Sequence, residues 1–179
     1  MKKLILLTLT AVIYMHPAHS QPVIKIRGSE DSLTIKKQVA LYLEQLDVRE
    51  QVYLTVVFTP QMPEKLEGIT LCVSPSAPND SQFIKVKINA RLGKKQQEIM
   101  LAHEMVHVKQ YAKGELIVNT DQQVIWKGRK YFYQPAARQH LPWENEAFQQ
   151  DNRLTIQWKE YLKNSLNSEA PLTASKTDP

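Results

Sequence analysis

Segment 95–113 restricts the fold more than any other part of the sequence, because it is long enough for a helix and apolar on nearly every side. Successive helical residues lie about 100° apart, so His103 shares one side with Val106 while Leu101 lies opposite. A helix without a wide polar face is buried inside a domain. The sequence therefore predicts a central helix that other elements cover, ended by Gly114.

Composition limits the class of protein. With 179 residues, 42% of them hydrophobic and 23% charged, the chain can form one ordinary domain with a core, and wholesale disorder is excluded. The net charge of +5 is small and spread along the chain, so no nucleic-acid partner is expected. The single cysteine, Cys72, excludes an intrachain disulfide and a cysteine-rich zinc site.

Residues 1–20 have the pattern of a secretory signal peptide rather than of folded structure. Two lysines precede an apolar run, residues 4–15, that is too short to span a bilayer comfortably. Small residues, Ala18 and Ser20, occupy the −3 and −1 positions of a cleavage site. We therefore expect a secreted or periplasmic protein with no stable membrane span; the alternative is a segment retained as an N-terminal anchor.

The remaining chain divides into one domain, residues 21–164, and a polar tail, residues 165–179, which has no apolar period and is expected to be disordered. Apolar residues at helical spacing predict helices, and β-branched or alternating runs predict strands. The order of these elements predicts an α+β fold with an N-terminal and a C-terminal helix. The expected strands are 23–26, 52–58, 69–73 and 83–89, with a hairpin at 124–133. The first expected helix begins at Ser29 or Asp31 and ends near 47. The second covers 95–113, and the third runs from 142 to about 163.

His103 and His107 lie four residues apart in the central helix, in the sequence His-Glu-Met-Val-His. Helical residues at this spacing share a face, so the two imidazoles can bind one zinc ion. Glu104 is placed to reach a water on that metal, which is the H-E-x-x-H arrangement of zinc peptidases. Burying these groups without partners costs several kcal/mol, which a bound metal offsets. The alternative is a buried helix whose histidines bond to backbone carbonyls.

A catalytic zinc site needs a third protein ligand and an open position for water. The sequence offers His140, Glu144 and Glu146, just before or within the last helix. Glu144 falls inside the apolar stripe of that helix, whereas Glu146 lies among polar residues as a solvated acid. The stripe consists of Ala147, Phe148, Leu154, Trp158 and Leu162. Because a carboxylate inside such a stripe needs a cation, Glu144 is favoured, with His140 and Glu146 as alternatives.

His103-Glu104-x-x-His107 is followed, after a spacer, by Glu144-x-x-Ala147 on a second helix. The flanks include Trp126-Lys127-Gly128 and Leu141-Pro142-Trp143. Over residues 50–160 this pattern resembles the gluzincin branch of the zincin metallopeptidases, especially small bacterial members with a minimal scaffold. The resemblance implies a small mixed β-sheet packed on an active-site helix and one Zn²⁺ per chain. It also implies His103, His107 and Glu144 as ligands and Glu104 as general base. One departure is Phe148, since many gluzincins carry an acid four residues after the glutamate ligand.

Further side chains are available to complete such a site. Asp151, in the same apolar stripe, either orients a ligating imidazole or forms a salt bridge inside the core. Such sites usually add a donor for the oxyanion of the transition state. The available donors are Tyr111, Tyr131, Tyr133 and His140, although the hairpin tyrosines are better explained as core residues.

Segment 83–89 alternates apolar residues with Lys85 and Lys87, which is typical of a half-buried strand at an exposed sheet edge. An extended peptide substrate could add to such an edge as a further strand. On this hypothesis, Ile88→Pro removes peptide binding and leaves the zinc content unchanged.

These features favour a secreted zinc-dependent metallopeptidase that hydrolyses peptide bonds with a zinc-bound water activated by Glu104. An amidase acting on cell-wall peptides would use the same chemistry. One alternative is a zinc-containing domain that binds a protein or cell-wall partner without hydrolysis, and another is a structural domain without metal. The intact Glu104 favours an enzyme, because a binding domain needs no base at that position.

Overall fold

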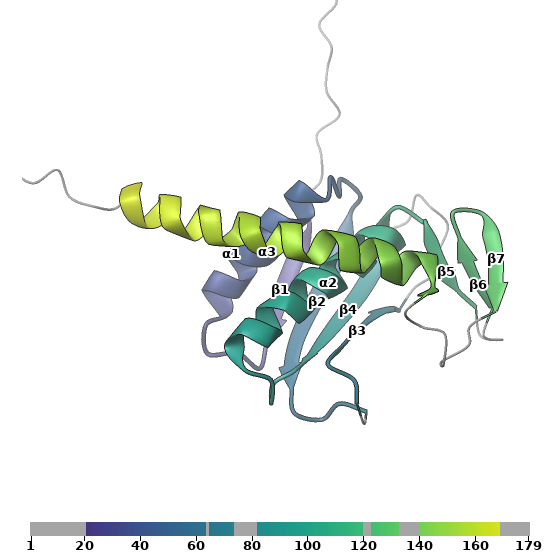
Figure 1. Ribbon diagram of the computed structural model, residues 1–179, viewed down its shortest axis with the longest axis horizontal. Coiled ribbons are helices and arrows are strands. Elements are labelled where there is room, and N and C mark those ends of the chain that lie inside the picture. Colours follow the sequence, from purple (N-terminus) through teal and green to yellow (C-terminus); the bar gives the residue numbers. More distant parts are fainter. Residues whose placement is uncertain (1–20, 64, 74–81, 120–122, 133–139, 169–179) are drawn as a thin grey trace, which may run out of the picture.

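The computed structural model describes residues 21–63, 65–73, 82–119, 123–132 and 140–168. These residues form three helices and two small sheets, with helices near both ends (Figure 1), so the predicted α+β class is confirmed. The predicted signal peptide, Tyr133 and residues 169–179 of the predicted tail lie outside the described residues.

The larger sheet is mixed, as expected for the predicted fold. Its first three strands in spatial order are parallel, and the fourth is antiparallel to its neighbour. The order is β1 (Val23–Arg27), β2 (Val52–Thr59), β4 (Gln82–Asn89) and β3 (Gly68–Cys72). Helix α1 (Ser32–Gln45) connects β1 to β2, and of the two predicted caps it uses Asp31, whose side chain accepts a hydrogen bond from the Thr34 amide at 3.3 Å.

Strand β4 is an internal strand, so the prediction that segment 83–89 forms an exposed edge is wrong. Lys85 is paired with Thr55 on one side and with Leu71 on the other. Alternating lysines report that one face of a strand is exposed, and they carry no information about its lateral neighbours. A peptide cannot add to β4, because both sides of its backbone are already paired.

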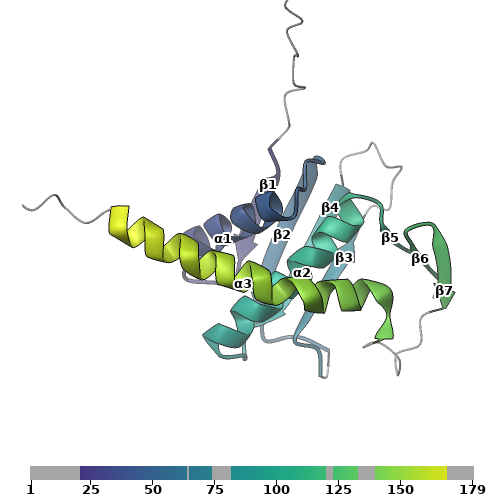
Figure 2. The ribbon, with the colours of Figure 1, turned by 45° about the horizontal axis from the view of Figure 1, so that its top comes forward.

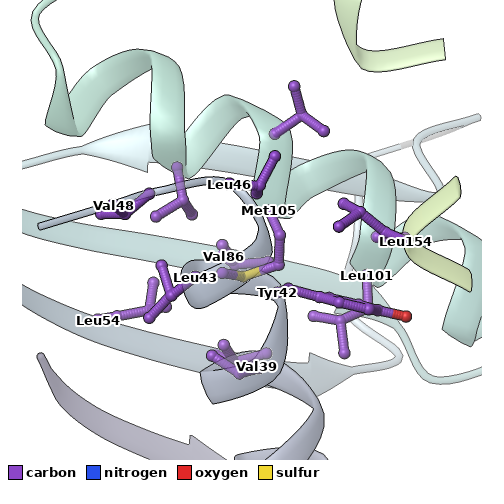
Figure 3. Packing of buried hydrophobic residues seen from close by; sticks show 14 of the residues in the cluster. Val39, Tyr42, Leu43, Leu46, Val48, Leu54, Val86, Leu101, Met105 and Leu154 are labelled. Carbon is purple, nitrogen blue, oxygen red and sulfur yellow. The ribbon is translucent and has the colours of Figure 1, made fainter. Parts of the chain in front are cut away.

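Helix α2 (Lys94–Ala112) lies between the larger sheet and helix α3 (Pro142–Ser168), which crosses over it (Figures 1 and 2). All ten residues 101–110 are buried, which confirms the predicted central helix. The main core joins α1, the sheet, α2 and α3 (Figure 3). Its members include Val39, Tyr42, Leu43, Leu54, Val86, Leu101, Met105 and Leu154.

The smaller sheet is antiparallel and contains β5 (Leu116–Val118), β6 (Gln123–Trp126) and β7 (Arg129–Phe132). Lys127 and Gly128 connect β6 to β7 with φ angles of 47° and 78°, the positive values that a tight two-residue hairpin requires. The predicted hairpin is therefore present, whereas β5 was not predicted, because three residues directly after a helix show no period. A second apolar cluster joins this sheet to the start of α3 and contains Leu116, Val124, Trp126, Leu141 and Trp143.

Helix α3 extends beyond the predicted end near residue 163 and reaches Ser168. Residues 165–168, which their polar composition placed in the disordered tail, are therefore helical. The reason is that a solvated helix end needs no apolar residues, and the chain contains no proline or glycine between 143 and 170 to stop it. Within the described ranges, none of the helices combines the length and apolar character needed to cross a bilayer.

Candidate metal centre

Three buried side chains converge where α2 passes the first turn of α3. His103, His107 and Glu144 are 3%, 5% and 5% exposed. The Glu144 Oε2 atom lies 3.4 Å from His103 Nε2 and 3.6 Å from His107 Nε2. Of the sequence candidates for a third ligand, the structure thus brings Glu144 to the histidines. We call these three residues the metal group.

The spacing within the metal group fits a single ion. One ligand atom from each of the three residues lies within 4.8 Å of the other two. In a tetrahedral site with bonds of about 2.0–2.1 Å, ligand atoms are separated by about 3.3 Å, close to the two nitrogen–oxygen distances here. Imidazole and carboxylate are also donors that divalent first-row metals accept. The metal group is therefore able to hold a metal ion.

Both imidazoles direct Nε2 towards Glu144 and Nδ1 towards a polar group behind the ring. His107 Nδ1 lies 2.8 Å from Gln110 Oε1, a short hydrogen bond. His103 Nδ1 lies 3.5 Å from Asp151 Oδ2, within ion-pair reach but without hydrogen-bond geometry. Asp151 is therefore placed where it can orient the His103 imidazole. The ring of Phe148 packs on the same imidazole, with ring centroids 4.7 Å apart.

Negative charge is concentrated around the two imidazoles. Glu104, Glu144 and Asp151 are 1%, 5% and 9% exposed. Burial disfavours the charged form of His107, but its hydrogen bond with Glu144 and the nearby charge of Glu104 outweigh burial and raise the pKa of this imidazole. Several buried carboxylates in one place require compensation by a cation. A bound divalent metal would provide it.

Glu104 is held against the edge of the larger sheet by two residues that the sequence did not reveal. Thr70 Oγ1 donates a 2.7 Å hydrogen bond to Glu104 Oε2. Gly68 allows the carboxylate to approach the strand, because a Cβ atom at this position would lie 2.6 Å from Glu104 Oε1. The one available signal was the glycine beside a predicted strand, which often marks a close approach of another group.

A cavity of about 360 Å³ opens beside the metal group. Glu104, His107 and Glu144 lie in its wall together with Tyr111. The rest of the wall comes mostly from apolar residues of β3, β5, β6 and the start of α3. These lining residues include Ile69, Leu71, Leu116, Val118, Val124 and Trp143. The cavity is thus a largely apolar space with its polar groups at the metal group.

The structure separates the predicted oxyanion donors. Tyr111 lines the cavity, and burial, together with the charges of Glu104 and other nearby groups, raises the pKa of its hydroxyl so that it stays protonated. Tyr131 instead packs edge-on against Trp143, with ring centroids 5.7 Å apart, as expected for a core residue. His140 is exposed and does not join the metal group. Of the predicted oxyanion donors within the described residues, Tyr111 is therefore the one that the fold places at the cavity.

Glu146 is not the solvated acid that its position on the polar face predicts. Its side chain is 19% exposed, and its Oε1 atom lies 3.1 Å from Lys109 Nζ and 3.4 Å from Lys127 Nζ. Lys109 Nζ also pairs with Glu115 at 2.6 Å. Burial opposes ionisation, but hydrogen bonds with Gln110 and Lys109 outweigh it and lower the pKa of Glu146. We call Lys109, Glu115, Lys127 and Glu146 the ion-pair cluster.

Lys109 of the central helix is also buried in this cluster. The residue is 9% exposed, and hydrogen bonds with Glu115 and Glu146 outweigh burial and raise the pKa of its ammonium group. Helical periodicity describes one helix at a time. It does not report that the polar sides of α2 and α3 face each other.

No protein-family model, curated protein or solved structure matches this chain. The interpretation of the site therefore depends on its own residues and geometry.

Proposed function

We propose that this chain is a zinc-dependent peptidase of the gluzincin type, with His103, His107 and Glu144 as ligands and Glu104 as general base. One observation carries the proposal: the two Nε2 atoms converge on the Glu144 carboxylate beside a cavity whose wall contains His107, Glu144 and Glu104. Two histidines and one glutamate are a known ligand set of catalytic zinc and leave a fourth position for water. A purely structural zinc site would instead be closed by four protein ligands.

Zinc bound at this site would supply a Lewis acid and lower the pKa of a coordinated water to about 7. Glu104 takes a proton from the attacking water and passes it to the leaving amine. The Thr70 hydroxyl fixes the orientation of this carboxylate. Tyr111, which burial keeps protonated, is available to donate a hydrogen bond to the developing oxyanion.

The substrate is proposed to lie along β3, which is the edge strand of the larger sheet beside the cavity. Main-chain groups of an edge strand can pair with an extended peptide. The apolar residues that line the cavity favour a substrate with an apolar side chain near the cleaved bond. The peptide site expected at segment 83–89 is thereby replaced by one at β3.

A metal-binding domain without hydrolytic activity is the second candidate, because the same three ligands would serve it. Glu104 favours the enzyme. A buried carboxylate outside the three ligands, held by Thr70 and accommodated by Gly68, is placed as a base, whereas metal binding alone needs only the ligands. An amidase acting on cell-wall peptides is compatible with the proposal, since the attacked carbonyl is the same.

The test measures zinc per chain by mass-spectrometric metal analysis and cleavage of a quenched-fluorescent peptide library. We expect about one zinc per chain and cleavage in the wild type. Glu104→Gln should keep the zinc and lose at least about 100-fold in kcat, whereas Glu98→Gln, a control on the same helix, should change neither. Absence of zinc after incubation with it at neutral pH, or full activity in Glu104→Gln, would refute the proposal. Zinc binding without cleavage of any peptide would favour the second candidate.

A further inference from the structure

Gln110 is completely buried and connects the metal group to the ion-pair cluster. Its Oε1 lies 2.8 Å from His107 Nδ1. Its Nε2 donates to the Trp143 carbonyl oxygen at 2.9 Å and to Glu146 Oε2 at 2.8 Å. One amide thus contacts a metal-group histidine on α2 and two acceptors on α3.

The two acceptors determine which way the amide points. A backbone carbonyl and a carboxylate only accept hydrogen bonds, so both must face the NH₂ group of Gln110. A flipped amide would place its oxygen against two other oxygens in a buried site and would remove the hydrogen bond that each of them now accepts from Gln110. The amide oxygen must therefore face His107.

The orientation of the amide determines in turn where His107 carries its proton. The Gln110 Oε1 atom can only accept, so a hydrogen bond at 2.8 Å requires the proton on Nδ1 of the neutral ring. The lone pair then remains on Nε2, the nitrogen that lies 3.6 Å from Glu144 Oε2. A ring with its proton on Nε2 would have to lose it before a metal could bind.

We propose that Gln110 is a positioning residue that selects the metal-binding tautomer of His107, and that Trp143 and Glu146 hold the Gln110 amide in the required orientation. Helix α3 therefore acts twice on the metal group. It carries the ligand Glu144, and within the same turn it carries the two acceptors that act through Gln110. The inference rests on the proposed metal site and is independent of peptide hydrolysis.

The experiment uses metal-free protein labelled with ¹⁵N-histidine, at a pH where the rings are neutral, because the two ring nitrogens give different NMR shifts in each tautomer. We expect the proton of His107 on Nδ1 in the wild type. Gln110→Met keeps a side chain of similar length without an amide, and we expect it to move the proton largely to Nε2. Zinc affinity, measured by competition with a chromogenic chelator, should fall by at least about 10-fold.

The matched control is Gln38→Met, which removes another buried glutamine, on α1, whose Nε2 donates to the Tyr42 hydroxyl. It should change neither the His107 signals nor the zinc affinity. A milder variant, Glu146→Ala, keeps Gln110 and the Trp143 acceptor, and we expect a partial tautomer shift and a zinc affinity several-fold lower. This variant tests the inference if Gln110→Met does not fold.

Two results would overturn the inference: a wild-type His107 with its proton on Nε2, or unchanged tautomer and zinc affinity in both Gln110→Met and Glu146→Ala. Failure of the wild type to bind zinc would also overturn it, together with the proposed function. The expected tautomer and affinity changes in a protein that cleaves no peptide would support the role of Gln110 and refute only the peptidase.

Discussion

The metal group and the ion-pair cluster are neighbouring polar regions between α2 and α3, and they differ in how their charges are compensated. The ion-pair cluster contains two lysines and two glutamates, with nitrogen–oxygen distances of 2.6 to 4.0 Å. In the metal group, by contrast, the partners of the carboxylates are imidazoles: both histidines lie beside Glu144, and His103 also lies beside Asp151. The Glu104 carboxylate adds a further negative charge nearby. The first region is complete as folded, whereas the second gains its compensation from a bound cation.

This difference separates two kinds of buried polar group in one helix pair. Lys109 and Glu146 stabilise the contact between α2, α3 and the hairpin, and need nothing from outside the chain. Glu104, Glu144 and Asp151 place three buried carboxylates next to two imidazoles, which is typical of a binding site rather than of a structural contact. Substitutions in the metal group should therefore act mainly on metal binding, and substitutions in the ion-pair cluster mainly on stability.

The largest effect is expected for Glu144→Ala. Removing one of three ligands should lower zinc affinity by more than about 100-fold, a larger loss than for a residue that only orients a ligand. Zinc at 100 times its Kd stabilises the wild type by about 2.7 kcal/mol, and the variant should lose that gain in a chemical unfolding titration. Glu146→Ala, two residues along the same helix, should stay within about 10-fold of the wild-type affinity. Equal losses in both variants would abolish the distinction between the two regions.

Gly68→Ala should displace the Glu104 carboxylate beside the metal group without touching the ion-pair cluster. The added Cβ would lie 2.6 Å from Glu104 Oε1, so the carboxylate must move. A displacement of this size in a catalytic base costs up to about 100-fold in kcat, while zinc content should remain at one per chain. Gly93→Ala is the control, because its Cβ meets nothing within 4 Å. An unchanged peptidase kcat in Gly68→Ala would exclude Glu104 as a precisely oriented base.

Glu146→Gln should affect stability more than metal binding. At neutral pH the loss of charge beside Lys109 should lower the free energy of unfolding by about 1 to 3 kcal/mol, with one zinc per chain retained. Because folding lowers the pKa of Glu146 from 4.5, the ionised side chain stabilises the protein above pH 4.5, and this contribution is lost as the pH falls further. The stability difference between the two metal-free proteins should therefore shrink in acid. A constant difference from pH 7 to pH 3 would contradict this origin.

The smallest effect is expected for Asp151→Asn. The amide keeps an oxygen near His103 Nδ1, but the negative charge opposite that ring is removed. Zinc affinity should fall by about 10-fold, with little change in the stability of the metal-free protein. Asp47→Asn, on an exposed carboxylate, should leave zinc affinity unchanged. A large loss of metal-free stability would show that Asp151 acts as a core ion pair rather than through the imidazole.

Local periodicity was enough to predict much of the site. The spacing of His103 and His107 places both on one side of any helix, and the apolar surroundings of that helix predicted its burial. Helical periodicity along the last helix also favoured Glu144 over Glu146, and Glu144 is the residue that lies beside the histidines. These inferences succeeded because the geometry of one helix is the same in any fold.

Contacts between distant elements were not predictable in this way. The sheet order places β4 inside and β3 at the edge beside Glu104, and no pattern within either strand reports its neighbours. The roles of Thr70, Gln110 and Lys109 likewise depend on hydrogen-bonding groups 34, 33 and 37 residues away that tertiary packing brings within 3.1 Å. The sequence by itself thus determined which residues can bind a metal, since ligand type and helical spacing are local properties. Only the tertiary structure decided how those residues are oriented and compensated, because buried hydrogen bonds and ion pairs form between elements whose relative positions are not encoded in any one of them.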